Sequence, residues 1–360
     1  QAMEPYLQEN YGNASTAYSI GEDARRELEK SREVIAATLH AKTSEIYFTS
    51  GGSESDNWAV KNIAAACKKK GRHIITTNIE HHAILNSCEY LEKLGYDVTY
   101  LEVDGDGLIS PEQVMDAIRP DTTLISVMFA NNEVGTIEPI YQIGKIAREK
   151  QILFHTDAVQ AYAQIPLYVN YYPVDLLSAS AHKFHGPKGV GFLYIRDGID
   201  IPSFIHGGSQ ERGKRAGTEN VAGIVGMAKA AEIAYGNMRK RVQKEIMLRN
   251  YLIERVMHEI PDAKLNGHRS IRLPGNVNFS FKGLEGASLL ILLDEDGICA
   301  SGGSACNTGE ERISYVIKAL GVPEEYAPGT IRLTLCGDTT RADVDTALAS
   351  LKRNIAILRG

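Results

Sequence analysis

A lysine and a cysteine lie in two unusual loops, and both side chains could react with a substrate. Lys183 stands in the segment Ser-Ala-Ser-Ala-His-Lys-Phe-His-Gly-Pro-Lys-Gly, residues 178–189, which begins within an apolar run. A lysine at such a strand end can lose its proton and form a Schiff base, although Lys188 also fits a solvated basic loop. Cys306 is surrounded by small residues in segment 300–309. An exposed thiol in a flexible loop can reach a substrate and withdraw again.

Further polar residues follow other apolar runs. Asp157 ends the segment Phe-His-Thr-Asp, and Gln160 comes three residues later, on the same face of an expected helix. A carboxylate at this place either caps the next helix or pairs with a cationic ring nitrogen of a cofactor. His81, in the segment Glu-His-His-Ala, could stack on a flat ring or carry protons near neutral pH. For its neighbour His82 we favour a structural role.

A glycine pair predicts a place where backbone approaches a ligand. Residues 46–57 read Ile-Tyr-Phe-Thr-Ser-Gly-Gly-Ser-Glu-Ser-Asp-Asn, a strand followed by Gly51 and Gly52 and then a helix capped by Ser53 or Ser55. Free N–H groups at a helix start favour an anion such as phosphate. The segment has neither the P-loop nor the dinucleotide-binding pattern, so an ordinary strand-to-helix turn is the alternative.

Two more segments could hold a substrate. Asn132, in Asn-Asn-Glu-Val-Gly, either caps a turn or bonds a ligand. Arg332 lies inside an apolar strand pattern, where it needs an anionic partner: a structural acid or a substrate carboxylate held by two parallel hydrogen bonds. The pair His182 and His185 suggests zinc, but no cysteine or acid lies nearby at ligand spacing, so we expect no metal site.

Alternating strand and helix patterns must position these residues. Strands are predicted at 46–49, 73–77, 97–102, 123–129, 152–155, 176–179 and 190–194, with helices at 55–70, 83–94, 110–118 and 140–150. Several of these strands are apolar almost throughout, as in a sheet covered on both faces. Repeated β-α units predict an α/β fold with a mostly parallel sheet, whose ligands bind at the carboxyl ends of the strands.

The pattern changes after residue 237. A long charged helix is predicted at 238–259, followed by strands at 276–281, 297–301 and 330–335 and helices at 286–294, 310–320 and 342–358. We therefore expect a large α/β domain at 1–237 and a small C-terminal α+β domain at 238–360, which carries the Cys306 loop.

The order of the motifs resembles one enzyme family over essentially the whole chain. Ser-Gly-Gly-Ser-Glu-Ser-Asp-Asn, Glu-His-His-Ala, Asn-Asn-Glu-Val-Gly, His-Thr-Asp-Ala-Val-Gln, Ser-Ala-His-Lys-Phe-His-Gly-Pro-Lys-Gly, Arg-Ala-Gly-Thr-Glu-Asn and Ser-Gly-Gly-Ser-Ala-Cys follow one another. This series is similar to the pyridoxal-phosphate-dependent cysteine desulfurases of the NifS/IscS type, in their long-loop subgroup. The resemblance implies an aspartate aminotransferase-like fold (fold type I), with a seven-stranded sheet in the large domain and a homodimer.

The resemblance also implies roles for single residues. Lys183 would hold pyridoxal 5'-phosphate and, once released, move the proton from the substrate Cα. Asp157 would pair with the ring nitrogen, His81 would stack on the ring and assist proton transfer, and Gln160 would bond the phenolic oxygen. The phosphate would be bound by Gly52, Ser53, Ser180 and His182, with Thr218 reaching across from a second subunit.

The substrate implied by the resemblance is L-cysteine. Asn132 and Arg332 would hold its carboxylate. Cys306, as a thiolate, would attack the substrate sulfur, keep it as a persulfide and release alanine, supplying a sulfur acceptor or an iron–sulfur scaffold protein. The family normally begins with Asp-Asn-Ala-Ala-Thr-Thr, and this sequence starts after that position, so we expect truncation or disorder there. A role for Cys336, where the family usually reads differently, stays open.

Composition narrows the alternatives. With 39 Lys and Arg against 45 Asp and Glu, the net charge of −6 disfavours general binding to nucleic acid or to an anionic membrane. No apolar run approaches the roughly 18 residues of a membrane span, and no signal peptide is visible. Five cysteines without a Cys-x-x-Cys pair indicate a reducing cytoplasm, with Cys67, Cys88 and Cys299 expected in apolar cores. The remaining alternatives are a selenocysteine lyase, a related class V aminotransferase, and a non-catalytic scaffold with a relic cofactor fold.

Overall fold

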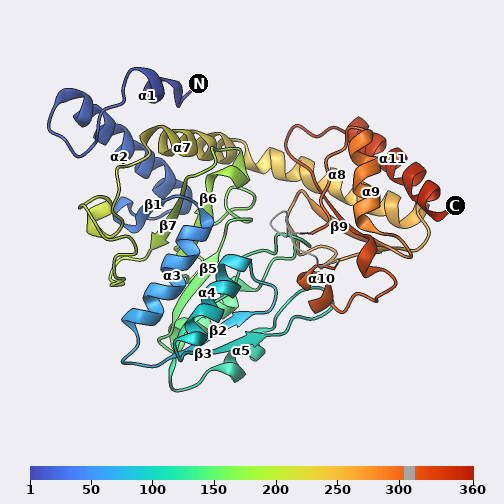
Figure 1. The fold of residues 1–360 in the computed structure, drawn as a ribbon, viewed down its shortest axis with the longest axis horizontal. Coiled ribbons are helices and arrows are strands. Elements are labelled where there is room, and N and C mark those ends of the chain that lie inside the picture. The colour runs from blue at the N-terminus through green and yellow to red at the C-terminus, as the bar shows by residue number, and fades with distance from the viewer. Residues whose placement is uncertain (304–312) are drawn as a thin grey trace. The chain divides into compact units, whose positions relative to one another are not determined.

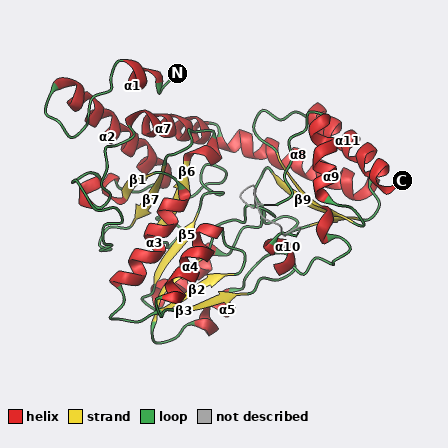
Figure 2. Ribbon diagram, viewed as in Figure 1, coloured by secondary structure: helices red, strands yellow, loops and turns green. Residues whose placement is uncertain are grey.

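The computed structural model describes residues 1–303 and 313–360, and these form two compact units (Figures 1 and 2). The first unit comprises residues 1–101, 110–129 and 139–237, and the second comprises 102–109, 130–138 and 238–360. The second unit thus starts at Met238 but also takes in two short segments from the first half of the chain. The assignment of one domain to cofactor binding and the other to the cysteine loop stays a prediction.

The first unit is built on a seven-stranded sheet in the order β1-β7-β6-β5-β4-β2-β3. Its strands are β1 (Ile46–Thr49), β2 (His73–Thr77), β3 (Asp97–Leu101), β4 (Thr122–Ser126), β5 (Leu153–Asp157), β6 (Leu176–Ser180) and β7 (Gly191–Ile195). The neighbours β3, β2, β4, β5 and β6 pair in parallel, and β7 runs antiparallel between β6 and β1. The predicted mostly parallel sheet of an α/β fold is confirmed, because long apolar runs bury both faces of its strands.

Seven helices belong to the described part of the first unit. They are α1 (Glu4–Gln8), α2 (Ser19–Leu39), α3 (Gly52–Ala66), α4 (His82–Lys93), α5 (Pro111–Ala117), α6 (Ile140–Glu149) and α7 (Val221–Gly236). Helix α3 lies across the sheet in Figure 1 and packs on β4, β5, β6 and β7. Its buried residues Trp58 and Ile63 meet Leu124, Leu176 and Leu193 of the strands in one apolar cluster. That packing holds α3 in place, and with it the turn at Gly51 and Gly52, where the helix begins.

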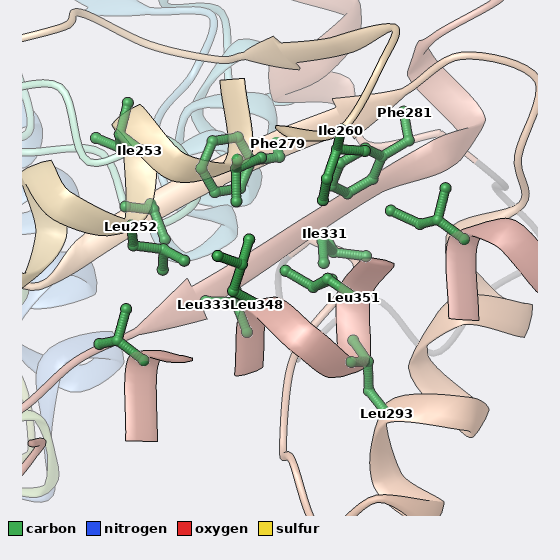
Figure 3. Close-up of a cluster of buried hydrophobic side chains, with 14 of the residues drawn as sticks. Leu252, Ile253, Ile260, Phe279, Phe281, Leu293, Ile331, Leu333, Leu348 and Leu351 are labelled. Carbon is green, nitrogen blue, oxygen red and sulfur yellow. The ribbon is translucent and has the colours of Figure 1, made fainter. Parts of the chain in front are cut away.

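The second unit contains a small antiparallel sheet and the helices that cover it. Its elements are α8 (Met238–Glu259), β8 (Ala263–Leu265), β9 (Asn276–Phe281), α9 (Gly286–Glu295), α10 (Tyr315–Ala319), β10 (Thr330–Thr334) and α11 (Arg341–Arg359), with the strand order β10-β9-β8. Figure 3 shows its core, in which Phe279 and Ile331 of the sheet face Leu252, Leu293 and Leu351 of the helices. Helix α8 has the predicted bounds.

One predicted strand of this unit is wrong. Residues 297–301 form no strand; only Ser301 makes an isolated bridge, opposite Arg332. The chain leaves α9 through a turn at Gly297, whose φ is +76°, and meets β10 only at Ser301. Cys299 is therefore exposed rather than part of the core, whereas Cys88 is buried as expected. None of the described helices is both long and apolar enough to cross a membrane.

Candidate functional site

The turn between β1 and α3 is held against the ends of two other strands. Gly51 has φ +144°, and a Cβ on Gly52 would lie 2.6 Å from Cγ2 of Val159 and 3.7 Å from Cβ of Ser180. A side chain at Gly52 would therefore displace Val159, so glycine permits this close approach. The first N–H groups of a helix lack partners within the helix, and at α3, a helix of 15 residues, they favour an anion at this turn.

The predicted serine cap of α3 is wrong. The helix begins at Gly52, earlier than predicted, so Gly51 occupies the N-cap position. Glycine has no side chain, and the cap therefore contains no side-chain hydrogen bond. Ser55 instead turns inward: its hydroxyl lies 2.8 Å from that of Thr49 and donates to the carbonyl of Gly51 at 3.2 Å. These bonds join the first turn of α3 to the end of β1. Ser53 is left in the first turn without the capping role.

Asp157 ends β5 and is buried, with 5% of its surface exposed. Its Oδ1 accepts a hydrogen bond from the backbone N–H of Val159 at 2.8 Å. Burial raises the pKa of Asp157, whereas His81, the Val159 N–H and Lys183 act to lower it. The structure thus brings the predicted carboxylate, imidazole and amine close enough to influence one another. Gln160 lies in a turn, and the predicted helix that would carry it beside Asp157 does not form.

His81 is the N-cap of α4 and lies half-buried after β2. Its Nδ1 accepts the backbone N–H of Ala83 at 3.1 Å. A neutral imidazole has one donor and one acceptor, so this bond places the ring proton on Nε2. The ring is therefore held in one tautomer by the helix start. The ring of His82 is 6.4 Å away, and burial together with His81 lowers the pKa of His82.

The segment after β6 supplies the predicted lysine. Ser180 ends β6 and is buried, and residues 181–184 form a 3-10 helical turn in which His182 and Lys183 are exposed. Burial, Lys183 and Lys188 lower the pKa of His182, so its imidazole tends to be neutral. The carbonyl of Lys183 accepts the side-chain amide of Gln164 at 3.3 Å. The imidazole of His182 and the amine of Lys183 thus follow β6, the strand whose last residue, Ser180, lies against the turn at Gly51 and Gly52.

Thr218 lies exposed in the loop that precedes α7. Arg215, three residues earlier, forms a two-armed pair with Glu54 in the first turn of α3, at 2.8 and 3.0 Å. This pair ties the loop to the end of α3 that follows the glycine turn. The role of Thr218 toward a second subunit stays a prediction.

The second unit brings the two predicted substrate residues together. Nη1 of Arg332, on β10, donates to the backbone carbonyl of Asn132 at 2.6 Å. Asn131 accepts the N–H groups of Glu133 and Val134 at 2.8 and 3.0 Å, which fixes the turn that carries Asn132. Asn132 is buried, and its Oδ1 has no hydrogen-bond partner among the described residues. A buried amide oxygen normally has a hydrogen-bond partner, which a water molecule or a ligand would supply here.

Sequence reasoning missed a buried polar group behind Asp157. It consists of His155 on β5, Ser126 on β4, Ser178 on β6 and Asp56 on α3. The alternation of side chains along a strand places residue 155 on the same face as residue 157, and that signal was available. The sequence did not reveal the strand order or the position of α3, and these bring Ser126, Ser178 and Asp56 to His155.

The remaining predicted residue, Cys306, lies outside the described residues. Within residues 1–303 and 313–360, no group of three or more His, Cys, Asp or Glu side chains is placed to hold a metal ion.

Comparison with known proteins assigns the family. The Aminotransferase class-V family matches residues 1–347. The cysteine desulfurase IscS of Dictyoglomus turgidum is 53% identical over 359 residues, covering 100% of this chain and 91% of the relative. The chain belongs to the cysteine desulfurases of the class-V aminotransferase family. The resemblance in the motifs and the fold it implies are thereby confirmed.

Solved structures agree with this family. A NifS-like protein superposes with a TM-score of 0.93 at 40% identity and covers 99% of this cysteine desulfurase and 95% of its own chain. SspA, solved in complex with cysteine, gives a TM-score of 0.82 at 37% identity, covering 94% of this chain and 95% of its own. The α/β fold with a mostly parallel seven-stranded sheet is thus that of the NifS-like structures.

Proposed function

We propose that the protein converts L-cysteine to L-alanine with pyridoxal 5'-phosphate as cofactor and transfers the sulfur to Cys306. The observation that carries this proposal is the meeting of Asp157, His81 and Lys183 in the first unit. Its relatives that are named cysteine desulfurase support the same reaction. A buried carboxylate, an imidazole and a lysine amine are the groups that a cationic aromatic cofactor with an aldehyde requires.

The residues present fit this cofactor. The helix start at Gly52, where the backbone packs too closely on Val159 to allow a Cβ, would offer its free N–H groups to a phosphate, and Ser53, Ser180 and His182 would bind the phosphate with them. Asp157 would pair with the ring nitrogen, His81 would stack on the ring and Gln160 would bond the phenolic oxygen. Thr218 would complete the phosphate site from a second subunit. When bound, the cofactor supplies an electron sink for the carbanion formed at the substrate Cα.

The protein's own groups would orient the substrate and move protons. Arg332 would hold the cysteine carboxylate with two parallel hydrogen bonds, and the side chain of Asn132 would bond the same group. The amine of Lys183, after releasing the cofactor, would accept the proton from Cα and return a proton at the end of the reaction. His81, with its proton on Nε2, would assist these transfers.

The sulfur transfer balances without a further reactant. The Cys306 thiolate would attack the substrate sulfur, so that an S–S bond forms as the Cβ–S bond breaks. The bonding electron pair stays on Cβ, which takes up a proton to give the methyl group of alanine. The enzyme keeps the sulfur as a persulfide on Cys306. A sulfur acceptor or an iron–sulfur scaffold protein would then take it, in a homodimeric cytoplasmic enzyme.

Variants of two cysteines test this proposal. Cys306→Ala should keep the cofactor absorbance but lose alanine formation from L-cysteine, because the sulfur then has no acceptor. Cys299→Ala is the matched control, since it removes an exposed thiol seven residues earlier in the sequence and should leave the rate unchanged. Persulfide trapping by mass spectrometry, with alanine measured in parallel, gives the readout. Undiminished alanine and sulfide production by Cys306→Ala would refute the mechanism.

A further inference from the structure

A chain of buried polar side chains runs beneath Asp157. The hydroxyl of Ser126 lies 2.9 Å from Nδ1 of His155, and the hydroxyl of Ser178 lies 3.0 Å from Nε2. Ser178 also hydrogen-bonds Asp56, whose Oδ1 is 3.7 Å from Nε2 of His155. Asp56 is 1% exposed and the other three residues are no more exposed than that. Three parallel strands and α3 therefore enclose one continuous hydrogen-bonded chain.

Among the described residues, the charged groups that act on Asp56 are acids rather than cations. Burial lowers the pKa of His155 to about 3, so this imidazole is neutral. The cationic group Lys183 and the imidazole of His81 act on Asp157. Asp56 instead faces two acids, because burial and then Asp157 and Glu80 raise its pKa, while the Ser178 hydrogen bond opposes this. A buried carboxylate among like charges takes up a proton rather than stay ionised.

The hydrogen-bond chain has a place for that proton. A neutral imidazole donates through one nitrogen and accepts through the other. If Asp56 is a neutral acid, its O–H donates to Ser178, whose hydroxyl donates to Nε2 of His155. Nδ1 then carries the ring proton and donates to Ser126. Both nitrogens of His155 and both serine hydroxyls are then hydrogen-bonded, and Oδ1 of Asp56, which has no hydrogen-bond partner among the described residues, is an uncharged carbonyl oxygen.

We propose that Asp56 is a positioning residue for Asp157: its burial beside the acids Asp157 and Glu80 keeps it a neutral acid, whose proton enters the chain through Ser178 and His155, so that of the two aspartates only Asp157 carries negative charge. The inference rests on the proposed pairing of Asp157 with the cofactor ring. A second carboxylate charge beside Asp157 would change the proton affinity of the bound ring. The neutral Asp56 instead leaves Asp157 as the single countercharge.

Infrared spectroscopy of the holoenzyme tests the charge of Asp56 directly. In protein carrying aspartate labelled with ¹³C at the carboxyl carbon, a protonated-acid C=O band should persist at about pH 8, where exposed aspartates are ionised. In Asp56→Asn this band should be missing. The wild-type spectrum alone is decisive if the variant does not fold, because the absence of any protonated aspartic acid at that pH would overturn the proposal. A band that remains in Asp56→Asn would overturn it too.

The cofactor's visible absorbance gives a second readout. Asparagine mimics a neutral acid, so Asp56→Asn should shift the pH midpoint of the absorbance change by less than about half a unit. Asp157→Asn, the reference variant, should shift it by more than one unit. If Asp56 were ionised, its replacement would lower the midpoint by about one unit or more, which would overturn the proposal. Wild-type protein without cofactor absorbance would refute the proposed function instead, and the infrared band would still report on Asp56.

Discussion

Replacing Arg215 by methionine should weaken both the fold of the first unit and its hold on the cofactor. The carboxylate of Glu54 accepts Nε and Nη2 of Arg215 at 2.8 and 3.0 Å and the backbone N–H of Ser50 at 2.8 Å. The Glu54 side chain is only 8% exposed, and that of Arg215 is 21% exposed. In Arg215→Met, a nearly buried carboxylate would lose its only ion-pair partner among the described residues.

The burial of the pair sets the expected magnitude. Removing one partner of a buried ion pair costs about 3–5 kcal/mol, and the partial exposure of Arg215 places this case at about 3 kcal/mol. That loss is roughly a hundredfold in the folding equilibrium. Glu54 also lies in the first turn of α3, so its unpaired charge would oppose the phosphate there. We expect cofactor affinity to fall about tenfold, or about 1.4 kcal/mol.

The pH dependence has a definite sign. Although burial acts to raise it, hydrogen bonds from Arg215 and Ser50 hold the pKa of Glu54 below its usual value. A carboxyl whose pKa is lowered by folding stabilises the protein above its unfolded pKa, and this contribution is lost as the pH falls through the folded pKa. The difference in the free energy of unfolding between wild type and Arg215→Met should therefore be largest above about pH 5 and should shrink as the solution becomes more acidic.

Urea unfolding of the cofactor-free protein, followed by circular dichroism, measures the stability, and absorbance titration measures cofactor affinity. The control is the double variant Glu54→Gln/Arg215→Met, which removes the unpaired charge as well. It should recover part of the stability and most of the affinity, because loss of both partners costs less than loss of one. The reasoning is refuted if the double variant is no better than Arg215→Met in either measurement.

Three further outcomes are expected. Lys183→Ala should bind the cofactor without a covalent link and form no alanine from L-cysteine; borohydride reduction followed by mass spectrometry checks the link, and a linked cofactor would contradict the assignment. Arg332→Lys keeps the charge but loses the two-armed geometry, so the KM for L-cysteine should rise about ten- to a hundredfold at unchanged cofactor absorbance, and an unchanged KM would count against a carboxylate site. Burial raises the pKa of Glu138 to about 8, so wild-type stability should fall as the pH rises from about 4.5 toward 8. Glu138→Gln should remove that decline, by up to about 1.4 kcal/mol per pH unit in urea unfolding, and parallel curves for the two proteins would exclude a protonated Glu138.

Much of the fold could be predicted because its signals are local. The strand predicted at 152–155 begins with three apolar residues and leads to Asp157, and the charged helix Met238–Glu259 differs sharply in composition from what precedes it. The separate candidates Asp157, His81 and Lys183 follow different strands, and a parallel sheet collects such residues at one edge. Their proximity was therefore a consequence of the predicted topology.

The rest depends on contacts that periodicity does not encode. The cap of α3 was misplaced because Gly51 adopts a left-handed φ, which lets the helix start before the serines. Cys299 was placed in a core because an apolar pattern does not reveal that the chain turns away after α9. The chain through His155 requires the register between β4, β5 and β6 together with the packing of α3. The pairing of Asn132 with Arg332 joins positions far apart in the sequence.

The antiparallel strand β7 also bears on when the proposed phosphate site forms during synthesis. β1 pairs only with β7 in the sheet order, and the two are separated by about 140 residues of chain. The strand that leads into the glycine turn joins the sheet through β7, so this hold on the turn forms only after β7 has been made, and such long-range pairing is slow to form. A nascent chain that ends before residue 191 would contain Asp157, His81 and Lys183 but lack the edge that holds the turn. The cofactor is therefore expected to bind only after the first unit is complete, which makes its capture a late event in folding.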